Sequence, residues 1–250
     1  MRTLKMTLAY EGTRFSGWQV QPGRRTVQGE IEKALTAIEG APVRIHGSGR
    51  TDAGVHALGQ VASFELHNAI PCFNLRRALN RTLPPAIRAL EIEEAPAGFH
   101  ARIHATAKTY EYRMYREEVC PPFERRYVHH IPYPLDEQAM IAAAPLLVGE
   151  KDFRSFATGN GEHLESTIRT IFSSQMERRG PRLIYRVRGS GFLYNMVRNI
   201  VGTLVWIGRG VITTQDLDRI LAERDRRSAG PTAPAPGLFL ESVEYDRPID

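Results

Sequence analysis

A glycine-rich segment at residues 47–59 holds the residues best suited to chemistry. It places Arg50, Thr51 and Asp52 among four glycines, between two β-like runs. Glycines in such a place mark tight turns or close backbone approaches, so we expect a strained loop at the edge of a sheet. A carboxylate held on a rigid turn beside a cation is suited to act as a nucleophile or a general base.

The same loop also has a purely structural interpretation. Thr51 and Asp52 could form an Asx-type turn in a long hairpin, with Arg50 solvated. A phosphate cradle is disfavoured, because the loop lacks Gly-Lys-Ser/Thr and no Gly-x-Gly-x-x-Gly opens a helix here. The loop by itself leaves the catalytic and the structural interpretations open.

A second candidate lies on an apolar helix expected at residues 192–206. Asn195, Arg198, Asn199 and Gly202 fall at i, i+3, i+4 and i+7, which is one face of that helix. A helix this apolar is expected to be buried, and a buried arginine needs a carboxylate or phosphate partner. Either the stripe faces solvent, or Arg198 points into a cleft and pairs with a carboxylate, for which Asp52 is the candidate.

The order of predicted elements indicates two similar halves. The first half, residues 1–104, reads β-α-β-β-α-β, the ferredoxin-like order, and residues 105–250 repeat it with one extra helix. We therefore predict an α+β fold of two ferredoxin-like halves, which share a mixed, mostly antiparallel central sheet with helices packed on it and a cleft between the halves. The expected segments are strands 3–10, 43–46, 60–66, 87–94, 107–116, 168–177, 183–189 and 239–245, and helices 27–38, 73–83, 135–148, 192–206 and 214–224.

Composition points to an anionic partner and a reducing compartment. The formal net charge is +5 and the chain has only four lysines, so arginine carries the positive charge. Arginine suits phosphate forks and base stacking, which favours nucleic acid. The two cysteines read as free thiols, and neither a metal-ligand set, a signal peptide nor a membrane span is indicated. We expect a cytoplasmic protein.

Two arginine groups could contact an RNA backbone. Residues 11–25 form a long loop in which Phe15 and Trp18 lie beside arginines, a pattern suited to base stacking, although both aromatics could instead be tucked into the core. The second group lies on the helix at residues 73–83. The arginines are Arg14, Arg24, Arg25, Arg76, Arg77 and Arg81.

Six motifs in this order resemble the bacterial tRNA pseudouridine synthase A family over nearly the whole chain. The longest are Tyr-Glu-Gly-Thr-Arg-Phe-Ser-Gly-Trp-Gln at 10–19, Gly-Arg-Thr-Asp-Ala-Gly-Val-His-Ala at 49–57 and Gly-Phe-Leu-Tyr-Asn-Met-Val-Arg at 191–198. The others are Arg-Thr-Val-Gln at 25–28, Lys-Thr-Tyr-Glu-Tyr at 108–112 and Ala-Pro-Ala-Pro-Gly-Leu-Phe-Leu at 233–240.

This resemblance implies an isomerase that converts uridine to pseudouridine in the anticodon stem-loop of tRNA. It implies that Asp52 is the catalytic aspartate and that Arg198 pairs with it. Tyr110 would stack on the target base, and Arg50 would help to hold the uridine flipped out of its stack. The family is homodimeric, with one tRNA touching both subunits, and it uses no cofactor and no metal.

Two other functions remain as alternatives. A non-catalytic RNA-binding protein of paired ferredoxin-like modules would not need Asp52. A glycosidase-like hydrolase would need a second carboxylate close to Asp52, and none is assigned near the loop. The choice of uridines, their order, and whether Asp52 attacks C1′, attacks C6 or acts as a base are left open by the sequence.

Overall fold

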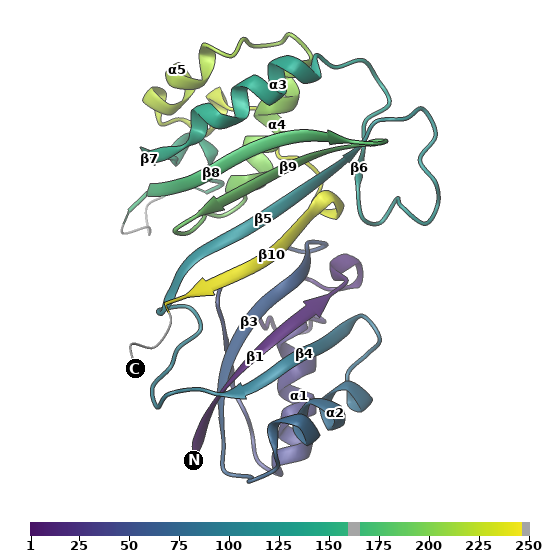
Figure 1. The fold of residues 1–250 in the computed structure, drawn as a ribbon, viewed down its shortest axis with the longest axis vertical. Coiled ribbons are helices and arrows are strands. Elements are labelled where there is room, and N and C mark those ends of the chain that lie inside the picture. The colour runs from purple at the N-terminus through teal and green to yellow at the C-terminus, as the bar shows by residue number, and fades with distance from the viewer. Residues whose placement is uncertain (160–165, 247–250) are drawn as a thin grey trace. The chain divides into compact units, whose positions relative to one another are not determined.

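The computed structural model describes residues 1–159 and 166–246, and the chain divides into two compact units. Unit 1 contains residues 1–106 and 239–250, and unit 2 contains residues 107–238. Both units combine a sheet with helices, as the predicted α+β class requires (Figure 1). Most of the strand pairs in the described residues are antiparallel, whereas β3 runs parallel to β10 and β5 to β6.

Unit 1 follows the predicted β-α-β-β-α-β order. Its elements are β1 (Arg2–Tyr10), α1 (Val27–Glu39), β2 (Ile45–Gly47), β3 (His56–Leu66), α2 (Cys72–Thr82), β4 (Ile87–Glu94) and β10 (Leu238–Tyr245). The sheet runs β4-β1-β3-β10. Two strands pair with the same edge of β3: β2 pairs with the C-terminal half of β3, and β10 pairs with its first two residues. The segment between β2 and β3 is therefore left to form a loop.

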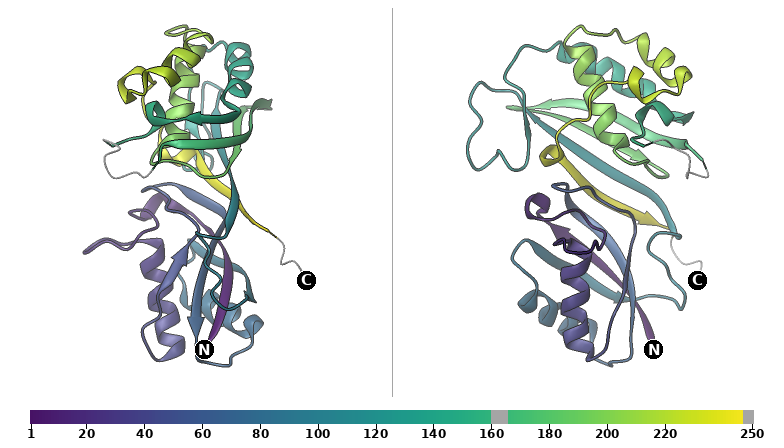
Figure 2. Two further views of the ribbon diagram at one scale, coloured as in Figure 1. Left: turned by 90° about the vertical axis from the view of Figure 1, so that its left-hand side faces the viewer. Right: turned by 180° about the vertical axis from the view of Figure 1, so that it is seen from behind.

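The helices of unit 1 form where the sequence supplies caps and an apolar stripe. The Thr26 side chain accepts a hydrogen bond from the backbone N–H of Gly29 at the start of α1, and Gly40 ends that helix in the left-handed region. Ile31 and Leu35 of α1 are fully buried against the sheet and α2. Viewed from behind, α1 covers the sheet of this unit (Figure 2).

The described strands form one mixed ten-stranded sheet, as predicted, and unit 2 holds its strands in the order β5-β9-β8-β7, with β6 paired to β5. Its strands are β5 (Ala105–Tyr115), β6 (His129–His130), β7 (Gly149–Asp152), β8 (Ile168–Arg179) and β9 (Arg182–Gly189). Its helices are α3 (Glu137–Ala143), α4 (Met196–Gly208) and α5 (Asp216–Glu223). Strands β6 and β7 were not predicted.

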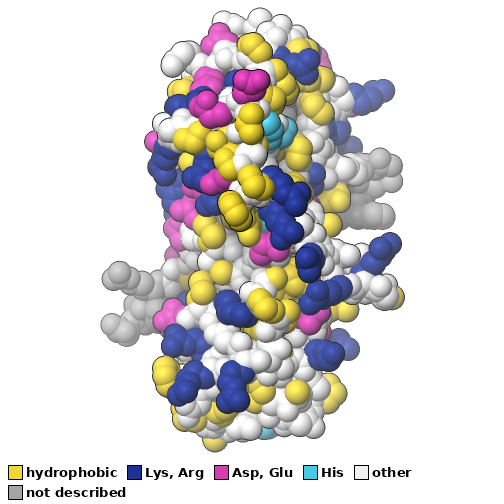
Figure 3. All heavy atoms as spheres, turned by 90° about the vertical axis from the view of Figure 1, so that its right-hand side faces the viewer, with side chains coloured by type: hydrophobic (Ala, Val, Ile, Leu, Met, Phe, Trp, Pro, Cys, Tyr) yellow, Lys and Arg dark blue, Asp and Glu magenta, His cyan; other side chains and the backbone are white. Residues whose placement is uncertain are grey.

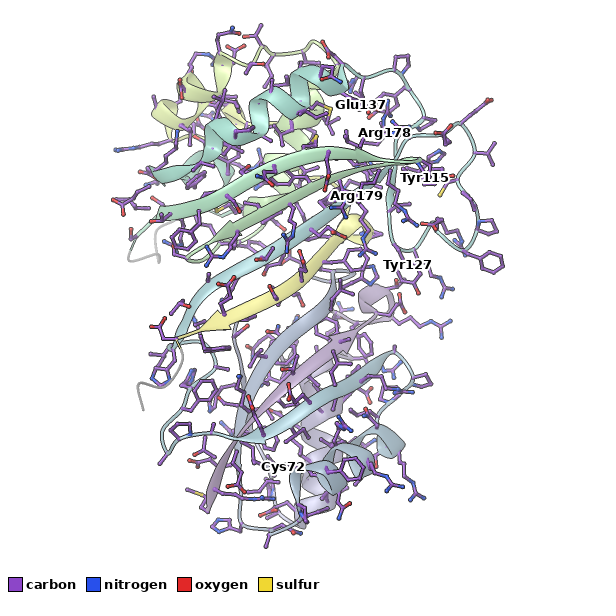
Figure 4. All side chains as sticks on the ribbon, viewed as in Figure 1. Cys72, Tyr115, Tyr127, Glu137, Arg178 and Arg179 are labelled. Atoms are coloured by element: carbon purple, nitrogen blue, oxygen red, sulfur yellow. The ribbon has the colours of Figure 1, made fainter. Side chains whose placement is uncertain are left out.

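Two helices of unit 2 begin or end differently from the prediction. The helix expected at 135–148 is α-helical only over α3, because Pro145 follows and residues 144–147 tighten into a 3-10 turn. The helix expected at 192–206 starts at Met196, since Asn195 adopts a left-handed conformation with φ 59°. Glu137 at the start of α3 lies 2.6 Å from Arg178 of β8, so an ion pair joins helix and sheet there (Figure 4).

The last strand belongs with the first half in space. Sequence order places it in the half formed by residues 105–250, but Phe239 and Leu240 pair with His56 and Ala57 of β3. The aromatic rings of Phe239 and His56 stack with centroids 4.7 Å apart. Strand β10 therefore supports the N-terminal end of β3, directly after the glycine-rich loop.

Candidate active site

The glycine-rich segment forms a loop that leaves β2 at Gly47 and enters β3 at His56. Asp52 is half-buried and Arg50 is exposed on this loop. The backbone N–H of Val55 donates to the carbonyl of Asp52 at 3.1 Å, and Gly54 has a φ of +79°, which only glycine adopts readily. The loop is thus the tight turn that its glycines predict.

A buried polar network holds the side of the loop that precedes Asp52. The Thr51 hydroxyl lies 2.8 Å from the Tyr10 hydroxyl, and the amide of Gln60 donates to the carbonyl of Gly49 at 3.0 Å. The Ser48 hydroxyl donates to the Gln60 side-chain oxygen at 2.7 Å. Since these polar groups are buried and bonded, displacement of the loop would break several hydrogen bonds at once.

Burial also keeps Tyr10 protonated. It raises the pKa of the Tyr10 phenol to about 12, although its hydrogen bonds with Thr51 and Gln60 oppose the shift. A neutral phenol can accept from Gln60 and can either donate to or accept from Thr51.

The segment between β1 and α1 holds the other side of the loop. The backbone N–H of Trp18 donates to the carbonyl of Thr51 at 3.0 Å. Gly17 has φ +88°, and a Cβ on it would lie 2.7 Å from the Thr51 carbonyl oxygen. A Cβ on Gly12 would lie 2.0 Å from the carbonyl oxygen of Val55, so the 11–25 segment and the glycine-rich loop are in contact through their backbones. Glycine is needed at both positions for this close approach.

The aromatic residues of that segment are structural. Phe15 is 4% exposed and Trp18 is 2% exposed, so neither ring can stack on RNA bases, and the core interpretation is correct. The Trp18 indole fills the space in which Gly47 would carry a Cβ, 2.5 Å away. Trp18 therefore packs one side of the loop against the end of β2.

His56 joins the same arrangement at the start of β3. It is 1% exposed, and its Nδ1 accepts a hydrogen bond from the backbone N–H of Gly12 at 3.0 Å. An accepting Nδ1 carries no proton. Sequence patterns gave no role to Tyr10, Gln60 or His56, because each is a polar residue on a strand whose partners come from distant parts of the chain.

The other two predicted site residues lie in unit 2. Tyr110 on β5 is 8% exposed, and its ring meets the Phe192 ring edge-on with centroids 5.0 Å apart. Arg198 on α4 is half-buried; its Nε donates to the carbonyl of Ala233 at 2.7 Å, and its Nη1 donates to the side-chain oxygen of Asn195 at 2.9 Å. These contacts hold the guanidinium group of Arg198 in place.

The polar stripe of α4 does not face solvent. Asn199 is fully buried; its amide nitrogen donates to the Phe156 carbonyl at 2.7 Å, and its oxygen accepts from Arg226 and Thr232. Gly202 lets the backbone at Pro231 approach closely. Three residues of the stripe thus organise the segment before β10, whereas the pairing of Arg198 with Asp52 stays a prediction.

No group of three or more metal-ligating side chains occurs in the parts of the chain that the structure describes. Within the same residues, no helix has the length and apolar character of a membrane span.

Comparison with known proteins identifies the family. A family model described as tRNA pseudouridine synthase matches residues 6–102 and 143–246. A protein of Solibacter usitatus named tRNA pseudouridine synthase A is 58% identical over 247 residues, covering 98% of this chain and 100% of that protein. Proteins of the same name from Brevibacillus brevis and Geobacillus kaustophilus are 47% and 46% identical, covering 98% and 97% of this chain and 100% and 94% of theirs. The chain belongs to the tRNA pseudouridine synthase family.

Proposed function

We propose that this isomerase converts uridine to pseudouridine in the anticodon stem-loop of tRNA, with Asp52 as its catalytic aspartate. The observation that carries the proposal is the way the Asp52 loop is held. Buried hydrogen bonds and backbone contacts through glycine hold it on both sides. A reacting group must be kept within a fraction of an ångström of its productive position, and this packing supplies that rigidity.

The reaction that follows from this assignment needs no group beyond the protein and the RNA. The N1–C1′ glycosidic bond of uridine breaks, the uracil turns, and C5 bonds to C1′. The hydrogen on C5 leaves as a proton and N1 gains one, so that atoms and charge balance in an isomer. The Asp52 carboxylate would act at C1′, at C6 or as a base toward the sugar, and each of these routes requires an ionised, oriented carboxylate.

Three further residues have proposed roles. Arg198 pairs with Asp52 and keeps it ionised, since a neighbouring cation favours the charged carboxylate. Tyr110 stacks on the target base, which offsets part of the cost of unstacking it. Arg50, exposed on the loop, helps to hold the extruded nucleotide.

We also propose a cytoplasmic homodimer in which one tRNA contacts both subunits, an expectation that rests on the family resemblance. Light scattering at increasing protein concentration tests the dimer. A mass equal to one 28.1 kDa chain at every concentration would reject it.

Product analysis tests the proposed reaction and its location. A tRNA transcript is incubated with the protein, digested to nucleosides and separated by chromatography. We expect pseudouridine in place of uridine, mapped to the anticodon stem-loop. Free uracil with an abasic sugar would indicate a hydrolase, and pseudouridine only in other arms of the tRNA would reject the proposed location.

A further inference from the structure

An arginine-lined recess lies between α2 and β4 in unit 1, outside the loop that carries Asp52. Its open volume is about 600 Å³. Three of its arginines come from the helix and one from the strand. The lining residues are Arg76, Arg77, Asn80, Arg81, Arg88, Ala89 and Leu90.

Two of the lining residues position the helix on the sheet. β4 is the edge strand of this sheet, and an exposed edge has unpaired backbone groups. The Asn80 side chain donates to the Ala89 carbonyl at 2.8 Å and accepts from the Ala89 N–H at 2.9 Å. Arg76 donates to the Leu90 carbonyl at 3.0 Å. These bonds satisfy backbone groups of Ala89 and Leu90 on the edge strand and fasten α2 to β4 beside the recess.

The recess carries positive charge without carboxylate partners. None of its four arginines forms an ion pair with any residue in the ranges 1–159 and 166–246. Arg77 and Arg81 are exposed, and Arg88 donates to the Pro84 carbonyl at 2.9 Å, so its guanidinium is held in place. In the part of Figure 3 that shows unit 1, Lys and Arg side chains gather over α2 and β4.

An exposed aromatic ring orients two of these cations. Phe73 is 58% exposed, and the guanidinium carbons of Arg76 and Arg77 lie 5.4 and 5.6 Å from its ring centre. Stacking on an aromatic face limits the freedom of an arginine and leaves its N–H groups directed outward. A planar fork of donors in this arrangement suits phosphate oxygens.

The recess opens at the same end of unit 1 as the Asp52 loop. Arg88 pairs with Ala9 of β1, and the next residue, Tyr10, contacts Thr51 beside Asp52. Strand β1 separates β4 from β3, so the recess, which extends from β4 onto α2, lies more than two strand spacings, about 10 Å, from β3. One polyanion can therefore reach both places.

We propose that this recess binds backbone phosphates of the tRNA that lie outside the anticodon stem-loop held at Asp52. The proposal rests on the proposed function for its choice of RNA. A long RNA presents phosphates at regular spacing, and cations that neutralise them release counterions on binding. The recess would thereby increase affinity for whole tRNA without touching the reacting uridine.

The test removes charge from the recess and leaves its framework. The variant Arg77→Gln/Arg81→Gln keeps the bonds of Asn80 and Arg76 to β4. The control Arg219→Gln/Arg227→Gln also removes two exposed positive charges, but those arginines form ion pairs with Asp216, Glu223 and Asp225. Binding and turnover are measured for full-length tRNA and for the isolated anticodon stem-loop, over a range of salt concentrations.

The recess variant should raise KM for full-length tRNA about tenfold and leave kcat unchanged. The factor follows because loss of one exposed charge weakens binding by roughly fivefold or less, and the variant loses two. The slope of log affinity against log salt should fall by about 1 to 2. Turnover of the isolated stem-loop should not change, and neither should any value for the control variant. Unchanged KM and salt slope for full-length tRNA would overturn the proposal, and so would an equal loss with the isolated stem-loop. Absence of turnover by the wild-type protein would instead reject the proposed function.

Discussion

Replacing Gly17 by alanine should impair catalysis, because a side chain on the neighbouring 11–25 segment would push the loop that carries Asp52 out of position. A Cβ at Gly17 would lie 2.7 Å from the Thr51 carbonyl oxygen and 3.2 Å from the Asp52 carbonyl carbon. Ordinary contacts begin near 3.5 Å, so the segment carrying Asp52 must move by about 0.8 Å. Gly17 also has φ +88°, at which alanine costs about 1 to 2 kcal/mol.

Gly23 is a matched control in the same segment. It has φ +68°, but no atom lies within 4 Å of the Cβ position. Gly23→Ala should therefore cost about 1 kcal/mol in the free energy of unfolding, from backbone strain alone. Gly17→Ala should cost about 2 to 4 kcal/mol, since overpacking adds to the strain.

Activity separates the two variants further. A displacement near 1 Å at a catalytic group costs about 100-fold in rate, so Gly17→Ala should lower kcat by about that factor while tRNA affinity stays within a fewfold. Chemical denaturation measures stability, and single-turnover rates on tRNA measure the chemical step. Equal rates for Gly17→Ala and Gly23→Ala, in preparations that are both folded, would refute the idea that this contact positions Asp52.

Three further predictions concern buried or half-buried polar groups. Tyr10→Phe removes the bond to Thr51 and should cost about 1 kcal/mol of stability, measured by denaturation, and lower kcat severalfold with unchanged KM. Asn199→Ala leaves buried partners unsatisfied and should cost about 3 kcal/mol, seen as a lower Tm. Burial, and secondarily His130, lowers the pKa of His129 to about 4, so the unfolded chain binds more protons between pH 6.5 and 4. Stability should fall by about 2 to 3 kcal/mol across that window as pH decreases, and His129→Gln should remove this part of the slope.

The first half of the fold was predictable because its signals are local. Helix α1 begins after Thr26 and ends before Gly40, as expected. Strands β1 and β3, predicted from their alternating residues, lie within a few residues of their predicted limits. The glycine-rich loop was identifiable because glycine in a left-handed or close-packed conformation leaves a visible pattern. The position of Asp52 on a tight turn therefore follows from the sequence alone.

The second half exposed the limits of local patterns. β6 has two residues and β7 has four, too short for alternation to be seen, and both exist because they pair with β5 and β8. The helix α4 starts four residues later than its apolar run, because Asn195 takes a left-handed conformation that its periodicity does not reveal.

Support for the site was also hidden from the sequence. Trp18 and Phe15 beside arginines resembled an RNA-stacking pattern, but both rings pack in the interior. The side-chain partner of Thr51 is 41 positions away in the sequence. The partners of Asn199 are 27 to 43 positions away. Contacts over such separations depend on tertiary packing, which motif spacing does not encode.

The most direct test of Asp52 as the catalytic group follows tritium released from tRNA labelled at uracil C5, because bonding of C5 to C1′ must expel that hydrogen. We compare the wild-type protein with Asp52→Asn and with Asp218→Asn, which removes an exposed carboxylate from α5. Release should fall by about 10⁴-fold in Asp52→Asn and remain normal in Asp218→Asn, with tRNA affinity retained in both. Release by Asp52→Asn at a rate near that of the wild type would contradict the assignment.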